Sequence, residues 1–148
     1  MPSPLTLETS IDEIVENFSF LEEWDDRYGY LIELGKALHP LDPSRMNETT
    51  KVQGCVSQVW VVGTVRVADG QKVLDFQGAS DAHIVRGLVA IALTLFSGKS
   101  PKEIMDTDEQ SVFQAIGLQE HLTPQRSNGL RAMVRRLKEM AHAEIEQG

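Results

Sequence analysis

The chain has 148 residues, of which 41% are hydrophobic and 24% are charged, and it carries a formal net charge of −8 with a sequence pI of about 4.9. This length and composition predict a single globular domain over residues 1–148, with a loose start over residues 1–8. The acidic balance argues against nucleic-acid binding, which usually requires a basic surface. The one cysteine excludes an internal disulfide and a multi-cysteine metal site.

The start of the sequence shows no basic segment followed by an apolar one. The longest apolar run, residues 87–96, is too short to span a bilayer. We therefore expect a cytoplasmic protein that does not have a membrane as a partner. Its acidic surface suits a protein partner with a basic docking face, because opposite charges speed encounter.

The first third of the chain predicts two helices and a loop. Residues 10–13 (SIDE) match a capping-box pattern, and apolar residues then recur at helical spacing. A second helix is predicted over residues 22–38, where apolar side chains line one face. Residues 39–50 contain two prolines and show no periodicity, which is typical of a loop.

The middle of the chain predicts a small three-stranded antiparallel sheet. Residues 57–67 are rich in β-branched residues, and Asp69-Gly70 is a strong hairpin-turn signal. Residues 72–78 are expected to return as the second strand. Residues 51–53 are expected to add a short third strand at the edge.

Helical patterns fill the remainder of the chain. Ser80 or Asp81 is expected to cap an apolar central helix that runs to Phe96. Three further helices are predicted, beginning at Ser100, Asp108 and Thr123. This order of elements argues for an α+β fold in which helices pack against the small sheet.

Cys55 lies in the segment KVQGCVSQVW, residues 51–60, between the predicted loop and the first strand. Gly54 permits a sharp turn ahead of the thiol. Turn N–H groups or the Ser57 hydroxyl can then stabilise the thiolate, which is the nucleophilic form of cysteine. From position alone, a buried Cys55 that serves as a small hydrophobic residue is equally open.

Two chemistries are open for an accessible thiol. A Cys–His hydrolase requires a histidine nearby in space, but no motif ties any histidine to Cys55. Transfer of a persulfide sulfur requires only one cysteine on each partner and is akin to thiol–disulfide exchange. The histidines also lack metal-ligand spacing, so no metal site is expected. They are His39, His83, His121 and His142.

Three separated segments resemble the signatures of one family. They are residues 52–60 (VQGCVSQVW), 80–88 (SDAHIVRGL) and 121–130 (HLTPQRSNGL). With shorter matches at residues 24–28 and 32–35, the resemblance extends from residue 10 to residue 145 in the order found in that family. The family is SufE, the sulfur-acceptor partners of cysteine desulfurases.

The resemblance implies an α+β fold related to the IscU-type scaffold proteins. It implies a protein that accepts sulfur on Cys55 from a PLP-dependent cysteine desulfurase of the SufS type, stimulates that enzyme and delivers the sulfur to a SufBCD-type iron–sulfur scaffold. Such a protein is a carrier with a persulfide intermediate rather than a free-standing enzyme. The PLP belongs to the desulfurase, so no cofactor is expected on this chain. The alternative is a binding module with CsdE-like partner choice that activates a desulfurase allosterically and keeps Cys55 as a structural residue.

The resemblance also implies supporting residues for the thiol loop. Gly54 and Ser57 flank the thiol, and Asp81 and Arg126 match family positions linked to the loop and to its response to the desulfurase. Simpler roles are open for the last two, because Asp81 can cap the central helix and Arg126 can make a surface ion pair. The sequence leaves a homodimer open.

Overall fold

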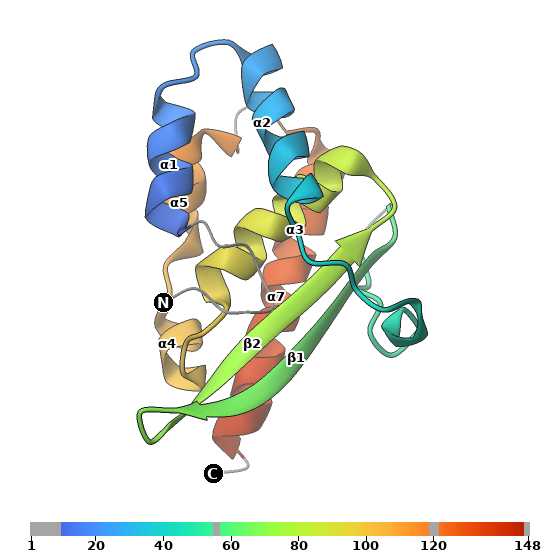
Figure 1. The fold of residues 1–148 in the computed structure, drawn as a ribbon, viewed down its shortest axis with the longest axis vertical. Helices are drawn as coiled ribbons and strands as arrows, with labels where there is room; N and C mark the ends of the chain where they lie inside the picture. The colour runs from blue at the N-terminus through green and yellow to red at the C-terminus, as the bar shows by residue number, and fades with distance from the viewer. Residues whose placement is uncertain (1–9, 55–56, 119–121, 147–148) are drawn as a thin grey trace.

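The computed structural model of the chain describes residues 10–54, 57–118 and 122–146. The elements run in the order α1 (Ile11–Ser19), α2 (Trp24–Lys36), η1 (Pro43–Arg45), β1 (Val59–Ala68), β2 (Gln71–Ser80), α3 (His83–Phe96), α4 (Pro101–Asp106), α5 (Glu109–Ile116) and α7 (Pro124–Glu146) (Figure 1). The predicted α+β architecture, with helices packed on an antiparallel sheet, is confirmed. Within the described ranges, none of the helices combines the length and the apolar character that a membrane span requires.

The antiparallel hairpin of β1 and β2 forms where the sequence predicts it. Asp69 and Gly70 both have positive φ values, 53° and 78°, which is the backbone conformation of a two-residue type I′ turn. Ala68 lies opposite Gln71, and pairing continues from there to the far end of both strands. The Asp-Gly signal therefore fixes both the turn and the register.

The predicted third strand is wrong for the described residues. Residues 51–53 make a single bridge, Lys51 to Trp60, and the sheet has two strands. A turn that ends at Thr50 precedes this segment, and Gly54, with a φ of +93°, follows it. Only three residues remain between the two turns, which is too few for a ladder.

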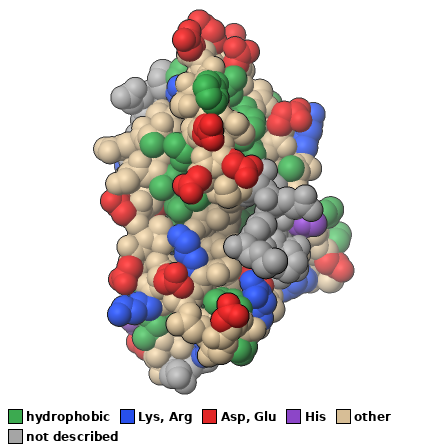
Figure 2. All heavy atoms as spheres, turned by 60° about the vertical axis from the view of Figure 1, so that its left-hand side comes forward, with side chains coloured by type: hydrophobic (Ala, Val, Ile, Leu, Met, Phe, Trp, Pro, Cys, Tyr) green, Lys and Arg blue, Asp and Glu red, His purple; other side chains and the backbone are tan. Residues whose placement is uncertain are grey.

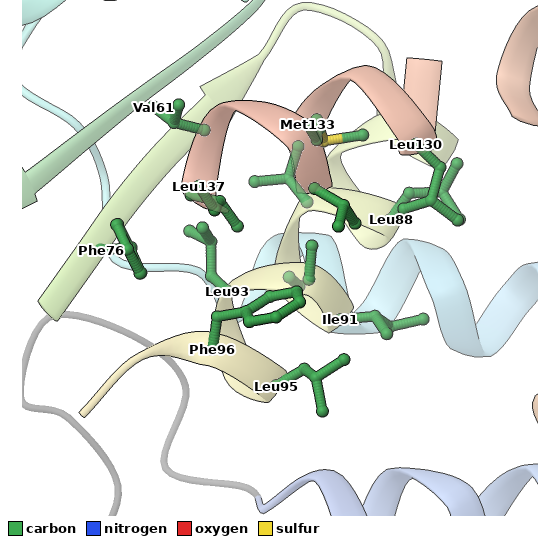
Figure 3. Close-up of a cluster of buried hydrophobic side chains, with 14 of the residues drawn as sticks. Val61, Phe76, Leu88, Ile91, Leu93, Leu95, Phe96, Leu130, Met133 and Leu137 are labelled. Atoms are coloured by element: carbon green, nitrogen blue, oxygen red, sulfur yellow. The ribbon is translucent and has the colours of Figure 1, made fainter. Parts of the chain in front are cut away.

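The core is built around α3, as the apolar pattern of the central helix predicts. All its residues from Gly87 to Phe96 are buried except Thr94. Figure 3 shows side chains of α3 meeting those of β2 and α7 in one cluster. Its labelled members include Phe76, Leu88, Leu93, Phe96, Met133 and Leu137. In Figure 1, α3 and α7 lie behind the hairpin, and α1 and α5 lie on the other side of α3.

Helix ends follow local sequence signals. The predicted capping box at the start of α4 is complete, because Ser100 and Glu103 each accept a hydrogen bond from the other's backbone N–H. These hydrogen bonds from Ser100 hold the pKa of Glu103 below its usual value. Helix α5 ends at Gly117, whose φ of 82° allows the left-handed cap that the sequence indicates.

One buried charge lies on the hairpin. Asp75 of β2 is only 2% exposed, and its Oδ2 accepts a hydrogen bond of 2.5 Å from Nε of Arg66 on β1. Its other oxygen, Oδ1, is buried without a hydrogen-bond partner among the described residues. The Arg66 side chain is 39% exposed and that of Asp75 only 3%. Solvent therefore reaches the guanidinium of this ion pair, whereas the carboxylate is shielded from water.

We predict that Arg66→Met lowers the free energy of unfolding by about 2 kcal/mol, because it leaves the Asp75 carboxylate buried without its cation. The double variant Arg66→Met/Asp75→Val removes both charges and is expected to recover most of that loss. Urea unfolding followed by tryptophan fluorescence measures both effects. An Arg66→Met variant as stable as the parent protein would contradict the prediction.

Candidate functional site

The loop that contains the cysteine position is anchored at its first end on β1. The N–H of Val52 donates to the carbonyl of Val59 at 2.8 Å, and the N–H of Val61 donates to the carbonyl of Thr50 at 2.9 Å. Val52 is also 2% exposed and belongs to the hydrophobic core. The chain therefore enters the loop from a fixed, buried position.

The second end of the loop is anchored on the connection between β2 and α3. Oδ1 of Asp81 accepts a hydrogen bond from the N–H of Gln58 at 3.1 Å, and the N–H of Asp81 donates to the carbonyl of Gln58 at 3.3 Å. This reciprocal pair joins residues 23 positions apart in the sequence. Asp81 thus fixes the exit of the loop rather than the start of a helix.

The expected capping role of Ser80 or Asp81 on the central helix is therefore wrong. The N-cap of α3 is Ala82, which has no side chain able to cap. The Ser80 hydroxyl accepts a hydrogen bond from the Ala82 N–H, at 3.2 Å, and not from the N–H groups inside the first turn of the helix. The Asp81 carboxylate accepts its hydrogen bond from Gln58, which directly precedes β1, a long-range contact that helix-capping rules do not include.

The sequence reasoning missed Arg86, one turn into α3. Its guanidinium donates two hydrogen bonds, of 3.3 and 3.0 Å, to the carbonyl of Ser80 at the end of β2. Arg86 therefore braces the same corner that carries Asp81. The only signal was its place inside the second family-like segment, residues 80–88.

Position 54 favours glycine because of its backbone conformation, and not because neighbouring atoms leave no room for a side chain. Its φ of +93° is strained for any residue with a side chain, whereas a Cβ at this position would lie an ordinary 3.4 Å from its nearest neighbour, Cβ of Ala132 on α7. The loop therefore turns sharply beside α7, as predicted. Cys55 and Val56 lie outside the described residues.

A small cavity of about 210 Å³ lies between this loop, α3 and α7. Ser57 and Arg126 both line it, so the structure brings together two predicted site residues that are far apart in the sequence. Apolar side chains of Val85, Leu88 and Met133 make up part of its wall. Asp81 does not line this cavity and acts on the loop from another side.

Arg126 is held at the start of α7. Its N–H donates to the hydroxyl of Thr123 at 3.3 Å, which is the usual geometry of a helix N-cap. The side chain is half-buried, and no ion pair of Arg126 is present within the described residues. The surface ion pair considered from the sequence is therefore not found there.

The chemistry of the cavity suits a small anion. A guanidinium beside partly apolar walls stabilises negative charge more strongly than it would in water. The Ser57 hydroxyl can donate a hydrogen bond to the same anion. The lining thus offers an anion one positive side chain and one hydroxyl donor, from Arg126 and Ser57.

The described histidines provide little support for a Cys–His hydrolase. His39 and His83 are exposed, and neither lines the cavity. Nδ1 of His142 lies 3.5 Å from Glu146 near the far end of α7. His121 lies outside the described residues. Within the described ranges, no group of three or more histidine, cysteine or acidic residues is placed to hold a metal ion.

Comparison with known proteins shows the family of this chain. Residues 12–141 match the family model described as "SufE: Fe-S metabolism associated domain". A SufE-like protein of Rhizobium meliloti (strain 1021), whose name calls it uncharacterized, is 51% identical over 137 residues, which cover 93% of this chain and 98% of that one. A SufE-like protein of Rhizobium etli, named in the same way, is 51% identical over 132 residues, or 89% of each chain.

A solved structure supports the fold independently. The solution structure of a hypothetical protein from Thermus thermophilus superposes with a TM-score of 0.68, covering 92% of this chain and 96% of that one. The two sequences are only 24% identical, so this similarity concerns the fold alone.

We predict that Asp81→Ala raises the hydrogen-exchange rate of the Gln58 amide by about fivefold to tenfold, because the amide loses a carboxylate acceptor worth about 1 kcal/mol. Asp81→Asn retains an acceptor oxygen and is the matched control, with a change of less than about twofold. Amide exchange followed by NMR measures both variants. Unchanged protection in Asp81→Ala would show that the carboxylate does not hold the loop.

Proposed function

Because the chain belongs to the SufE family, and so to proteins of iron–sulfur metabolism, we propose that it accepts sulfur on Cys55 from a cysteine desulfurase of the SufS type. It then carries that sulfur to an iron–sulfur scaffold of the SufBCD type. In this proposal the protein is a cytoplasmic carrier that also stimulates the desulfurase. The PLP that releases sulfur from free cysteine is on the desulfurase, and the present chain supplies only the accepting thiol.

The transfer step is a displacement at sulfur. The Cys55 thiol loses its proton to solvent, and the thiolate attacks the outer sulfur of the desulfurase persulfide. The sulfur–sulfur bond within that persulfide breaks, and the desulfurase cysteine leaves as a thiolate. Cys55 then holds the transferred sulfur as a persulfide, with no net oxidation or reduction.

The observation that carries this proposal is the cavity shared by Ser57 and Arg126 beside the cysteine loop. A positive side chain near the loop favours the thiolate over the thiol, which raises the fraction of Cys55 able to attack. The same charge stabilises the persulfide anion that results. Apolar neighbours such as Val85 and Met133 limit access of water-borne oxidants to a reactive sulfur.

The loop itself supports presentation to a partner. It is fixed at Val52 and at Gln58, and Gly54 between them adopts a conformation that other residues avoid. Only the few residues between these anchors can change conformation when the desulfurase docks. Short loops on a rigid scaffold are a common place for reactive groups.

We predict that Cys55→Ser abolishes sulfur uptake and leaves the fold intact. After incubation with a SufS-type desulfurase, PLP and cysteine, the parent protein is expected to gain the mass of one sulfur atom, and the variant is expected to gain none. Intact-mass spectrometry measures this, and Ser57→Ala is a control that keeps the thiol. A serine variant that still gained sulfur would contradict the proposal.

The same pair of proteins separates the carrier from a purely allosteric activator. If Cys55→Ser stimulated the desulfurase as fully as the parent protein does, Cys55 would be structural and the chain a binding module. Loss of stimulation together with loss of sulfur uptake supports the carrier.

The acidic surface of the protein supports electrostatic docking on the desulfurase. Figure 2 shows acidic side chains gathered at the upper end of the molecule, where α1 joins α2 in Figure 1. This connection and the first turn of α2 supply four exposed carboxylates. They are Glu22, Glu23, Asp25 and Asp26. Such a surface fits a basic face on the desulfurase.

We predict that raising the ionic strength from about 0.05 to 0.5 M slows sulfur uptake from the desulfurase severalfold, because salt screens charges that steer encounter. The variant Asp25→Asn/Asp26→Asn is expected to be slower at low salt and less sensitive to salt. Reactions quenched at a series of times and analysed by intact-mass spectrometry give the rates of sulfur uptake by the parent protein and by the variant. Salt-independent uptake by the parent protein would exclude electrostatic docking.

A further inference from the structure

A second cavity, of about 470 Å³, adjoins the corner between β2 and α3 that anchors the cysteine loop. Its lining includes Ser80, Asp81 and Arg86 of this corner and Trp60 of β1. It shares no lining residue with the 210 Å³ cavity beside the cysteine loop. Its volume lies within the range that small ligands occupy in proteins, about 300–1,000 Å³.

The walls of this second cavity are mostly apolar and are held in place. The segment between α2 and η1 supplies one side, and it crosses the hairpin near the end of β2 (Figure 1). Nη1 of Arg45 in η1 donates to Oε1 of Gln77 on β2 at 2.9 Å, which ties this segment to the sheet. The apolar side chains of the lining are those of Leu38, Pro40, Leu41, Met46, Trp60 and Ala79.

Three side chains with a permanent charge also line the second cavity. Nζ of Lys36 on α2 lies 3.7 Å from Oε1 of Glu33 and is paired there. Asp81 and Arg86 form no ion pair within the described ranges, either with each other or with another residue. Oδ1 of Asp81 accepts the N–H of Gln58, so Oδ2 is the carboxylate oxygen left for a ligand.

Asp81 and Arg86 lie close together at this end of the cavity. Nε and Nη2 of Arg86 donate to the carbonyl oxygen of Ser80 at 3.3 and 3.0 Å, and this carbonyl group is bonded directly to the backbone nitrogen of Asp81. Nη1 of Arg86 makes no hydrogen bond to the part of the chain that the structure describes. The corner therefore offers a free guanidinium donor and a free carboxylate oxygen beside an apolar cavity.

We propose that this second cavity binds a free α-amino acid with a large apolar side chain. The α-carboxylate pairs with Nη1 of Arg86, the α-ammonium pairs with Oδ2 of Asp81, and the side chain lies against Trp60. A simple carboxylate would pair with Arg86 but be repelled by Asp81, and a simple amine would meet the reverse. A zwitterion, whose two charged groups are attached to the same carbon atom, pairs with both side chains.

The apolar walls determine which kind of side chain the amino acid carries. Trp60 is half-buried, so its indole ring keeps surface on which an aromatic ring can pack. A phenyl or branched aliphatic group contacts these walls, whereas the methyl group of alanine leaves most of the space empty. Neither Cys55 nor a desulfurase takes part in this binding, so the proposed site is independent of the function proposed above. Because Asp81 also holds Gln58, the bound amino acid contacts the anchor of the cysteine loop.

A series of ligands tests which charges the cavity recognises. L-Phenylalanine, 3-phenylpropionate, which lacks the ammonium, and 2-phenylethylamine, which lacks the carboxylate, are titrated into isotope-labelled protein while NMR follows the Trp60 indole and Gln58 amide signals. Phenylalanine is expected to bind with a Kd below about 1 mM, and each analogue at least about tenfold more weakly, because it leaves one protein charge without its partner. L-Alanine is expected to bind as weakly as the analogues, because it lacks the apolar side chain. Equal affinity for phenylalanine and either analogue, or no binding of phenylalanine up to about 20 mM, would overturn the proposal.

Variants of the lining residues test the site itself. Asp81→Asn keeps the oxygen that holds Gln58 but removes the charge, so it is expected to bind phenylalanine at least about fivefold more weakly and 3-phenylpropionate more tightly than the parent protein does. Ala79→Ile fills the cavity beside Trp60, its partner across the hairpin, and is expected to weaken phenylalanine binding at least about tenfold. Thr64→Ile enlarges an exposed side chain on the same face outside the cavity and is the matched control, with unchanged affinity. Circular dichroism verifies that the variants fold. Binding of phenylalanine as tight as that of the parent protein, by Asp81→Asn or by Ala79→Ile, would overturn the proposed site.

Discussion

The burial of α3 on all sides is the constraint on which the rest of the structure depends. A Cβ at Gly87 would lie 2.2 Å from the carbonyl oxygen of Leu31, so the backbones of α2 and α3 touch with no room for a side chain. On its other sides α3 packs against β2 and α7. The start of α3 therefore cannot shift relative to the end of β2, and the corner between them, with Asp81 and Arg86, is a fixed point of the molecule.

That fixed corner anchors the exit of the cysteine loop. Asp81 holds Gln58 from one side, and the 210 Å³ cavity with Arg126 lies on another, so the loop is bounded by rigid elements. The sulfur-carrier role proposed above makes two opposed demands, since the thiol must reach a partner and the persulfide must be protected from small oxidants. A loop of a few residues between rigid anchors, beside a partly apolar cavity, satisfies both within one small domain.

Local features of this fold could be predicted from the sequence, and long-range ones could not. The turn at Asp69-Gly70, the capping box at Ser100 and the end of α5 at Gly117 depend on a few neighbouring residues, and all three are confirmed. The third strand failed because turns on both sides leave too few residues for it. Asp81 was assigned to a helix cap because its actual partner, Gln58, is 23 positions away. The meeting of Ser57 and Arg126 at one cavity depends on how α7 packs, which no local pattern encodes.

The two ends of the hairpin differ in what they leave uncovered. At the end near the cysteine loop, the carbonyl of Val59 and the N–H of Val61 are hydrogen-bonded to Val52 and Thr50, and Val59 and Val61 are buried. Toward the turn, the strand extends past this cover, and its free backbone groups lie beside exposed valines. Since a backbone group without a hydrogen-bond partner is costly only when it is buried, water can satisfy the groups of this exposed edge. The hairpin thus has a buried end at the cysteine loop and a solvent-exposed end at the turn.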